Sequence, residues 1–232
     1  EQLRANLLRS ISHDLRTPLT SISGNAGILI SNADSMGKEK QQQLYEDIYE
    51  DSLWLINLVE NLLSVTRIED GTMKLQLNAE LLEEIVQEAV HHVEKQCKKH
   101  KLRVQLSENL ILVKADARLI VQVLVNLVDN AVKYTPKGSE ILIETRQEGT
   151  NAVVSVSDNG SGISDEVKEH IFEMFYTGNS HAADSRRSLG LGLALCKSIL
   201  HAHGGDIFVE DCQLHGARFT FTLPAKEVQL HE

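Results

Sequence analysis

The stretch Ser12-His13-Asp14-Leu15-Arg16-Thr17-Pro18-Leu19 lies inside an apolar stripe of helical spacing that runs over residues 1–33. The members of the stripe are three or four positions apart: Leu3, Leu7, Ile11, Leu15, Leu19, Ile22, Ala26 and Leu29. At about 100° per residue, we expect His13 to point away from this stripe, with Asp14 beside it and Thr17 on the same face. An exposed imidazole next to a carboxylate and a hydroxyl suits chemistry rather than packing. A lone surface histidine is more often merely solvated, so this interpretation depends on the rest of the chain.

A second helix of the same kind is predicted over residues 38–68, after a turn cluster at 32–37. Two helices joined by a short loop form an αα-hairpin. A hairpin alone leaves much of its apolar stripe exposed. We therefore expect two copies to pair as a four-helix bundle, which makes the protein a homodimer. The alternative is that the hairpin packs on its own downstream domain. Pro18 cannot donate a backbone hydrogen bond, so a kink is expected in the first helix.

The pattern changes after Glu69-Asp70-Gly71, where short strands begin to alternate with helices. Strands are expected at 74–77, 102–106, 111–113, 140–145, 153–157, 207–210 and 218–223, and helices at 81–100, at 116–134 and after 190. This mixture predicts an α+β sandwich with helices on one face of a sheet. The chain thus divides into a hairpin domain, residues 1–70, and a sandwich domain, residues 71–232.

Composition excludes several classes of partner. The net charge of −10 argues against nucleic acid, and the 4% of aromatic residues predicts an aliphatic core. The three cysteines have no CxxC spacing, which suits a reducing compartment. The apolar runs are too short to span a bilayer. Because the chain begins in what reads as mid-helix, we expect a fragment of a longer protein, and any membrane contact would come through a part outside this chain.

Two further motifs point to a bound nucleotide. In the predicted helix 116–134, Asn126, Asn130 and Lys133 share one face, where amides and an ammonium could bind phosphate and hydrated Mg²⁺. The same spacing equally fits a solvated helix face. Asp158-Asn159-Gly160-Ser161-Gly162 follows a predicted strand, where a carboxylate could accept from an adenine amino group and glycines let a flat ring approach. Alone, this motif is usually a turn.

Gly190-Leu191-Gly192-Leu193 opens a predicted helix, whose unpaired N–H groups favour phosphate. Before it come Phe172-Glu173-Met174-Phe175-Tyr176 and a polar loop that holds Arg186 and Arg187. That loop could close over a nucleotide as a lid, or it could be an ordinary surface loop. Each signal is weak by itself, but their order and spacing make them strong together.

Taken together, these motifs resemble the catalytic core of bacterial sensor histidine kinases over essentially the whole chain. The five boxes of that family are similar to Ser12–Leu19 (H), Asn126–Pro136 (N), Asp158–Gly162 (first G), Phe172–Tyr176 (F) and Gly190–Leu193 (second G). The short lid segment is most like the potassium-responsive KdpD branch.

The resemblance implies a dimerisation and histidine-phosphotransfer hairpin joined to a GHKL (Bergerat) ATP-binding domain that uses ATP and Mg²⁺. It implies that His13 is autophosphorylated with Asp14 as general base, and that the phosphoryl group passes to an aspartate of a response regulator receiver domain. Thr17 would position water for phosphatase activity, and Asn130 would ligate Mg²⁺. The implied nucleotide-binding residues are Asn126, Asn130, Lys133, Tyr134, Asp158, Gly160, Gly162, Ile163, Arg186, Arg187, Gly190, Leu191, Gly192 and Leu193. The chain would be the cytoplasmic portion of a membrane-anchored bacterial sensor.

One residue separates a kinase from an ATPase. GHKL ATPases that resemble gyrase carry a water-activating glutamate at the place of Asn126, and an amide cannot act as a base, so water is not the expected acceptor. Ser188-Leu189 before Gly190, and Met174 in place of a common proline, depart from the family pattern and are read as lid variations.

Two other functions stay open at this point. One is a catalytically silent dimerisation and nucleotide-binding scaffold. The other is a GHKL serine kinase that resembles anti-sigma factors, which is disfavoured because those lack the long hairpin. The cluster His91, His92, Cys97 and His100 could suggest a metal site, but its spacing better fits a solvated helix end.

Overall fold

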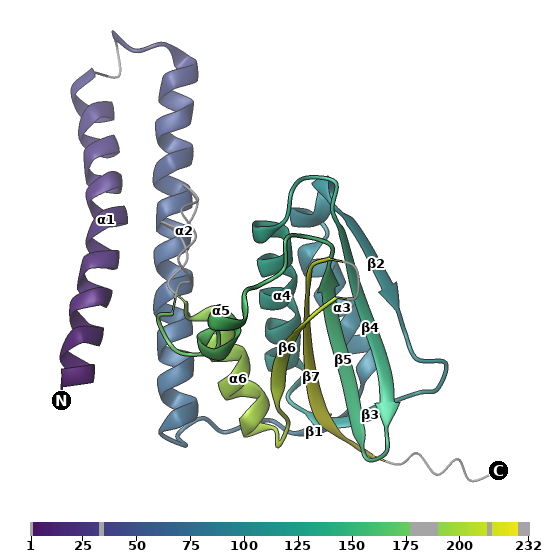
Figure 1. Cartoon of the computed structure of the whole chain (residues 1–232). Helices are drawn as coiled ribbons and strands as arrows, with labels where there is room; N and C mark the ends of the chain where they lie inside the picture. Colours follow the sequence, from purple (N-terminus) through teal and green to yellow (C-terminus); the bar gives the residue numbers. More distant parts are fainter. Residues whose placement is uncertain (1, 33–34, 177–189, 213–214, 227–232) are drawn as a thin grey trace.

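The computed structural model describes residues 2–32, 35–176, 190–212 and 215–226, with the side chains of the first helix described from Leu15 onward. A long helical hairpin stands beside a sandwich of helices on a sheet (Figure 1). Within these described parts of the chain, no helix combines the length and apolarity needed to cross a bilayer.

The hairpin consists of α1 (Gln2–Asn32) and α2 (Lys38–Glu69), which confirms both predicted helices. α1 continues through Pro18 as α-helix, and the proline ring is buried. α2 begins after Gly37 and ends at Glu69, and Gly71, with a positive φ of 63°, then turns the chain away from the helix axis.

Seven strands form one sheet in the described part of the sandwich. They are β1 (Asn78–Leu81), β2 (Lys101–Gln105), β3 (Leu112–Ala115), β4 (Glu140–Glu148), β5 (Asn151–Asp158), β6 (Ile207–Asp211) and β7 (Ala217–Lys226). The order is β1-β3-β7-β5-β4-β2, and β6 lies beside the first half of β7. Only β2 and β4 pair in parallel among these ladders.

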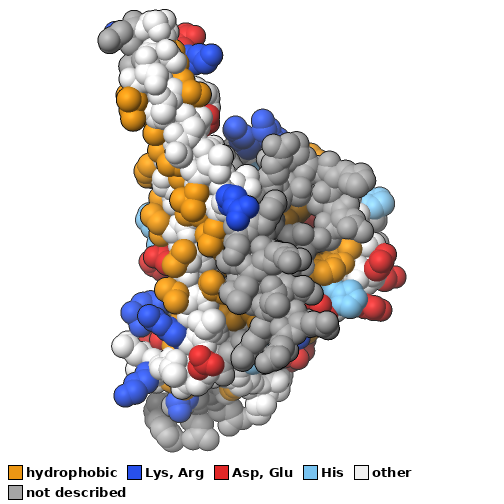
Figure 2. Space-filling model, turned by 90° about the vertical axis from the view of Figure 1, so that its left-hand side faces the viewer, with side chains coloured by type: hydrophobic (Ala, Val, Ile, Leu, Met, Phe, Trp, Pro, Cys, Tyr) orange, Lys and Arg blue, Asp and Glu red, His pale blue; other side chains and the backbone are white. Residues whose placement is uncertain are grey.

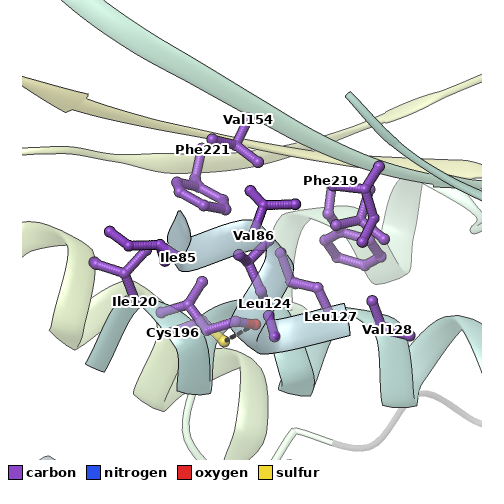
Figure 3. Packing of buried hydrophobic residues seen from close by; sticks show 14 of the residues in the cluster. Ile85, Val86, Ile120, Leu124, Leu127, Val128, Val154, Cys196, Phe219 and Phe221 are labelled. Atoms are coloured by element: carbon purple, nitrogen blue, oxygen red, sulfur yellow. Dashed lines mark hydrogen bonds between the residues drawn. The ribbon is translucent and has the colours of Figure 1, made fainter. Parts of the chain in front are cut away.

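One face of the sheet carries the helices α3 (Leu82–Val93), α4 (Ala117–Tyr134) and α6 (Gly192–Ala202), with the short α5 (Asp165–His170) at the edge of the layer (Figure 1). Alternation along β5 puts Val154 in the core, where it pairs with Phe221 of β7 and faces Leu124 of α4 (Figure 3). The predicted α+β sandwich is therefore confirmed.

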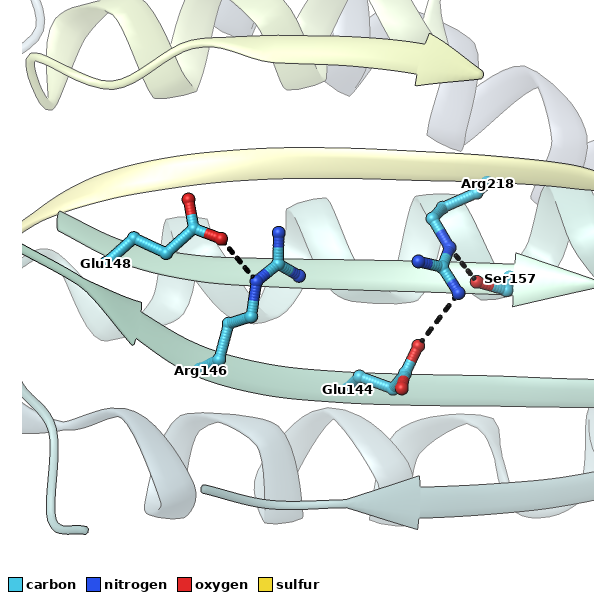
Figure 4. Close-up of polar contacts among 5 residues, drawn as sticks. All are labelled: Glu144, Arg146, Glu148, Ser157 and Arg218. Atoms are coloured by element: carbon cyan, nitrogen blue, oxygen red, sulfur yellow. Dashed lines mark hydrogen bonds and ion pairs between the residues drawn. The ribbon is translucent and has the colours of Figure 1, made fainter. Parts of the chain in front are cut away.

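The other face of the sheet is polar (Figure 4). Arg218 of β7 donates to Ser157 Oγ at 3.0 Å and pairs with Glu144 Oε2 at 3.2 Å. Arg146 pairs with Glu148 along β4 at 2.6 Å. The contacts of Arg218 between strands and the Arg146–Glu148 pair within β4 let the sheet present one face to water while the opposite face packs on helices.

Two local predictions were wrong, and one short helix was missed. Residues 74–77 are irregular, because the Gln76 N–H donates to the side chain of Asp116 at 3.1 Å and the strand forms only from Asn78. The helix predicted over 81–100 ends at Val93 and is followed by a 3₁₀ helix, Gln96–Lys99. His91 and His92 are exposed, as expected of a solvated helix end, whereas Cys97 is buried in the core. α5 was not anticipated.

The two parts of the chain touch through the end of α2. Val65 is fully buried in the same cluster as α4 and α6, and Gln122 Nε2 donates to Asn61 Oδ1 at 3.4 Å. Among the described residues, the hairpin thus packs on its own downstream domain through the last turns of α2. On the rest of its surface, the hairpin leaves apolar side chains exposed (Figure 2): Ile28, Ile30, Tyr45, Tyr49, Leu53, Ile56, Val59 and Leu63.

Candidate functional site

Asp158 stands at the end of β5, where the strand turns into a glycine loop. Its Oδ1 accepts the N–H of Gly160 at 2.8 Å and of Ala217 at 3.4 Å. The carboxylate is therefore fixed by backbone from two strand ends. Since both bonds go to Oδ1, the second oxygen, Oδ2, is the one that can accept from a ligand.

Two glycines that adjoin Asp158 have no room for a side chain. A Cβ on Gly160 would lie 2.8 Å from Thr135 Cγ2, which places the end of α4 against this loop. Gly216, with φ +106°, would put a Cβ 1.9 Å from the carbonyl oxygen of Asp158. The sequence analysis missed Gly216, because its partner Asp158 is close in space but far away in the sequence.

We expect Gly216→Ala to lower the free energy of unfolding by about 3 kcal/mol. Alanine disfavours the positive φ of Gly216, and its methyl group must also displace the backbone of Asp158. Urea unfolding measures the change. Gly149→Ala is the matched control: its φ is +57°, but its Cβ would meet open space among the described residues, so it should cost roughly 1 kcal/mol. Equal losses in the two variants would contradict the steric argument.

α4 carries the two candidate amides. Asn126 and Asn130 are half-buried, as is Lys133, whose Nζ lies 5.3 Å from the centre of the Tyr134 ring. Asn126 Nδ2 donates to the sulfur of Cys196 on α6 at 3.8 Å. This stripe is therefore packed against a neighbouring helix rather than fully solvated.

α6 begins at the second glycine motif. Gly190 has φ +63°, and a Cβ there would lie 2.3 Å from the carbonyl oxygen of Tyr176. Phe175, itself at φ +66°, donates its N–H to Gly190 O at 3.1 Å, so the end of the F-like segment is held on this glycine. Gly192, the first residue of α6, has open space around it among the described residues, which would let a phosphate reach the helix N-terminus.

The structure gathers three of the predicted motifs around α4. Contact between Thr135 and Gly160 brings in the first glycine loop, and the bond from Asn126 to Cys196 brings in the helix that follows the second. The remaining predicted positions are shielded from solvent to different extents: Leu191 is buried, and Gly162, Ile163 and Leu193 are half-buried.

Other predicted residues lie elsewhere or outside the described set. Thr17 is exposed on α1. The backbone of His13 and Asp14 lies in α1, but their side chains are outside the described ones, and Arg186 and Arg187 fall outside the described residues altogether.

Asp129, between the two amides, was also missed. Burial raises the pKa of its carboxyl to about 6, and its charge adds to the burial that raises the pKa of the nearby Cys97 thiol. The sequence did offer a signal for this burial. Val128 and Val132, which lie near Asp129 on the helix, are apolar and pack in or against the core.

Asp129→Asn should stabilise the protein most at high pH. A carboxyl with a raised folded pKa binds more protons in the folded state, so stability falls as pH rises from about 4 to 6 and stays low above that. At 1.36 kcal/mol per unit, removing the charge should add about 3 kcal/mol at pH 8 and less than about 1 kcal/mol at pH 4. Urea unfolding at both pH values checks this. The exposed Glu84→Gln on α3 is the control, and a gain independent of pH would refute the assignment to Asp129 ionisation.

Family models match both parts of the chain. Residues 3–71 match the His Kinase A (phospho-acceptor) domain, and residues 115–227 match the histidine kinase-, DNA gyrase B- and HSP90-like ATPase. The hairpin and the sandwich thus each correspond to a separate known domain.

Individual proteins agree with the family models. The chain is 47% identical over 224 residues to the sensor protein KdpD of Clostridium acetobutylicum and 39% identical to KdpD of Escherichia coli. Each match covers 97% of this chain, which spans about a quarter of the length of those relatives (25%). The crystal structure of histidine kinase ThkA in complex with the response regulator protein TrrA superposes with a TM-score of 0.72 at 27% identity, over 95% of this chain and 61% of that one. With a phosphoacceptor hairpin followed by an ATP-binding sandwich, the chain belongs to the sensor histidine kinases, on the branch represented by KdpD.

Proposed function

We propose that this chain transfers the γ-phosphoryl group of ATP to His13 and then to an aspartate in the receiver domain of a response regulator. The observation that carries the proposal is the meeting of three nucleotide motifs around α4, in a chain whose hairpin bears His13 and Asp14. The solved complex of ThkA with the response regulator TrrA supports a partner of this kind. Phosphatase activity through Thr17, exposed one turn after His13, belongs to the same proposal.

The nucleotide would be held by groups with separate tasks. Oδ2 of Asp158 accepts from the adenine amino group, and Gly160 lets the loop pack closely on Thr135 so that the carboxylate stays in place. Lys133 and Tyr134 at the end of α4, with Gly190 to Leu193 opening α6, bind the phosphates. Arg186 and Arg187 would add positive charge from the lid.

Mg²⁺ fits the donor set. Asn126 and Asn130 present neutral amide oxygens one helical turn apart, and Mg²⁺ takes few protein oxygens alongside phosphate oxygens and water. When bound, the ion offsets negative charge on the phosphates. Asn130 is the expected direct ligand.

The transfer itself needs a neutral imidazole, which histidine supplies near pH 7. An imidazole nitrogen of His13 forms the new bond to phosphorus while the bond to the bridging oxygen breaks, and ADP leaves. Asp14 takes the proton that the ring loses and orients the ring beforehand.

The active form is proposed to be a homodimer. The exposed apolar residues of the hairpin, among them Ile56 and Val59 of α2, form a surface that a second copy would cover to make a four-helix bundle (Figure 2). A cytoplasmic location is proposed as well, since Cys97, Cys196 and Cys212 are all unpaired.

Incubation with γ-labelled ATP and Mg²⁺, followed by acid and alkali treatment, tests the proposal. Label that is lost in acid and kept in alkali supports a phosphohistidine. Acid-stable label would instead indicate a serine kinase. Nucleotide binding without any label would indicate a scaffold.

A further inference from the structure

Cys196 lies where the two nucleotide helices meet. It is on the second turn of α6, its side chain is fully buried (0% exposed), and its sulfur contacts α4 (Figure 3). Two hydrogen bonds involve this sulfur. It accepts from Asn126 Nδ2 at 3.8 Å, and its S–H donates to the carbonyl oxygen of Val123 at 3.8 Å.

The direction of these bonds decides which way the Asn126 amide faces. Because the thiol proton goes to the Val123 carbonyl, the sulfur can only accept toward Asn126. An acceptor must meet the NH₂ end of an amide, so Oδ1 is turned away from Cys196.

The orientation matters because the two ends of an amide are chemically opposite. A cation or a metal-bound water needs the oxygen, whereas the NH₂ group would repel Mg²⁺. An amide free to flip would present the wrong end part of the time. α6 also begins at Gly192, so one contact holds both the amide and the helix expected to bind phosphate.

We propose that Cys196 is a positioning residue, which binds Nδ2 of Asn126 and thereby turns Oδ1 toward the Mg²⁺ and phosphates of bound ATP. The inference rests on the proposed function and names a residue that acts through Asn126 without touching the nucleotide.

The test measures how much Mg²⁺ strengthens nucleotide binding. Calorimetry with a non-hydrolysable ATP analogue, in EDTA and in Mg²⁺, is compared for the wild type, Cys196→Ala and Cys196→Ser. Alanine removes the acceptor, so the gain in affinity from Mg²⁺ should fall about 5- to 10-fold, while the EDTA affinity stays within about 2-fold. Serine keeps a hydroxyl that both donates and accepts, so it should restore most of the gain.

Cys97→Ala is the matched control, since Cys97 is also buried but lies beside Asp129. It should leave the Mg²⁺ gain unchanged, and urea unfolding of every variant separates lost stability from lost orientation. In an Asn126→Ala background, Cys196→Ala should have no further effect on the gain.

An unchanged Mg²⁺ gain in Cys196→Ala overturns the inference, whether or not the wild type labels His13. Absence of label in the wild type overturns the proposed function instead, so the two failures are distinguishable. An equal loss in Cys196→Ser and Cys196→Ala also overturns it, because packing rather than the hydrogen bond would then be responsible.

Discussion

The His13→Gln variant is expected to take up no acid-labile label from ATP, a fall of at least about 100-fold to the background of the assay. A glutamine amide has no nucleophilic lone pair, and glutamine is a good helix former, so α1 should persist. Nucleotide binding should be unaltered, because the nucleotide motifs gather around α4 in the sandwich.

The labelling assay and calorimetry with ADP check both parts of this expectation. His91→Gln is the control, since His91 is an exposed histidine on α3 and its loss should leave labelling at the wild-type level. Acid-labile label that persists in His13→Gln would place the phosphoacceptor elsewhere.

Asp158→Asn is expected to weaken ATP binding about 100-fold while the fold remains intact. The asparagine Oδ1 can still accept from Gly160 and Ala217, so the loop keeps its shape. At the ligand side, however, an NH₂ group replaces Oδ2. This NH₂ group then faces the adenine amino group, so that two hydrogen-bond donors meet and neither finds an acceptor. Leaving such groups unpaired is more costly than losing an apolar contact.

Inosine triphosphate provides the sharpest check, because it carries a carbonyl where adenine carries the amino group. Calorimetry in the His13→Gln background, where no turnover interferes, should show that Asp158→Asn reverses the preference toward inosine triphosphate. If both nucleotides weaken equally, Asp158 supports the loop but does not read the base.

Periodicity in the sequence predicted the elements well, because it reports on each element separately. The stripe through Leu15 and Leu29 predicted α1, and the alternation around Val154 predicted β5. The strand expected at 74–77 has the right alternation but was wrong, because the Gln76 N–H bonds to a residue 40 positions away. Local pattern cannot show that competition.

The candidate site divides in the same way. Spacing along α4 correctly put Asn126, Asn130 and Lys133 on one stripe, since 3.6 residues per turn decides it. The partners of that stripe came only from tertiary structure: Cys196 is 70 residues from Asn126, and Gly216 meets Asp158 across neighbouring strands. The roles of His13, Asp14 and the lid arginines remain predictions from the sequence.

The burial of Val65 sets an energy threshold for rotation of the hairpin relative to the sandwich. A full withdrawal of this side chain from the core would forfeit about 1.5–3 kcal/mol. Because packed side chains interlock, turning α2 about its axis by one residue would lift Val65 out of its socket rather than slide it gradually. A small rotation of α2 would therefore leave Val65 buried, whereas a rotation by a full residue would remove it from the core in one step. We therefore expect small fluctuations of α2 to leave the packing of the sandwich unchanged, and only a rotation that exposes Val65 to disturb it.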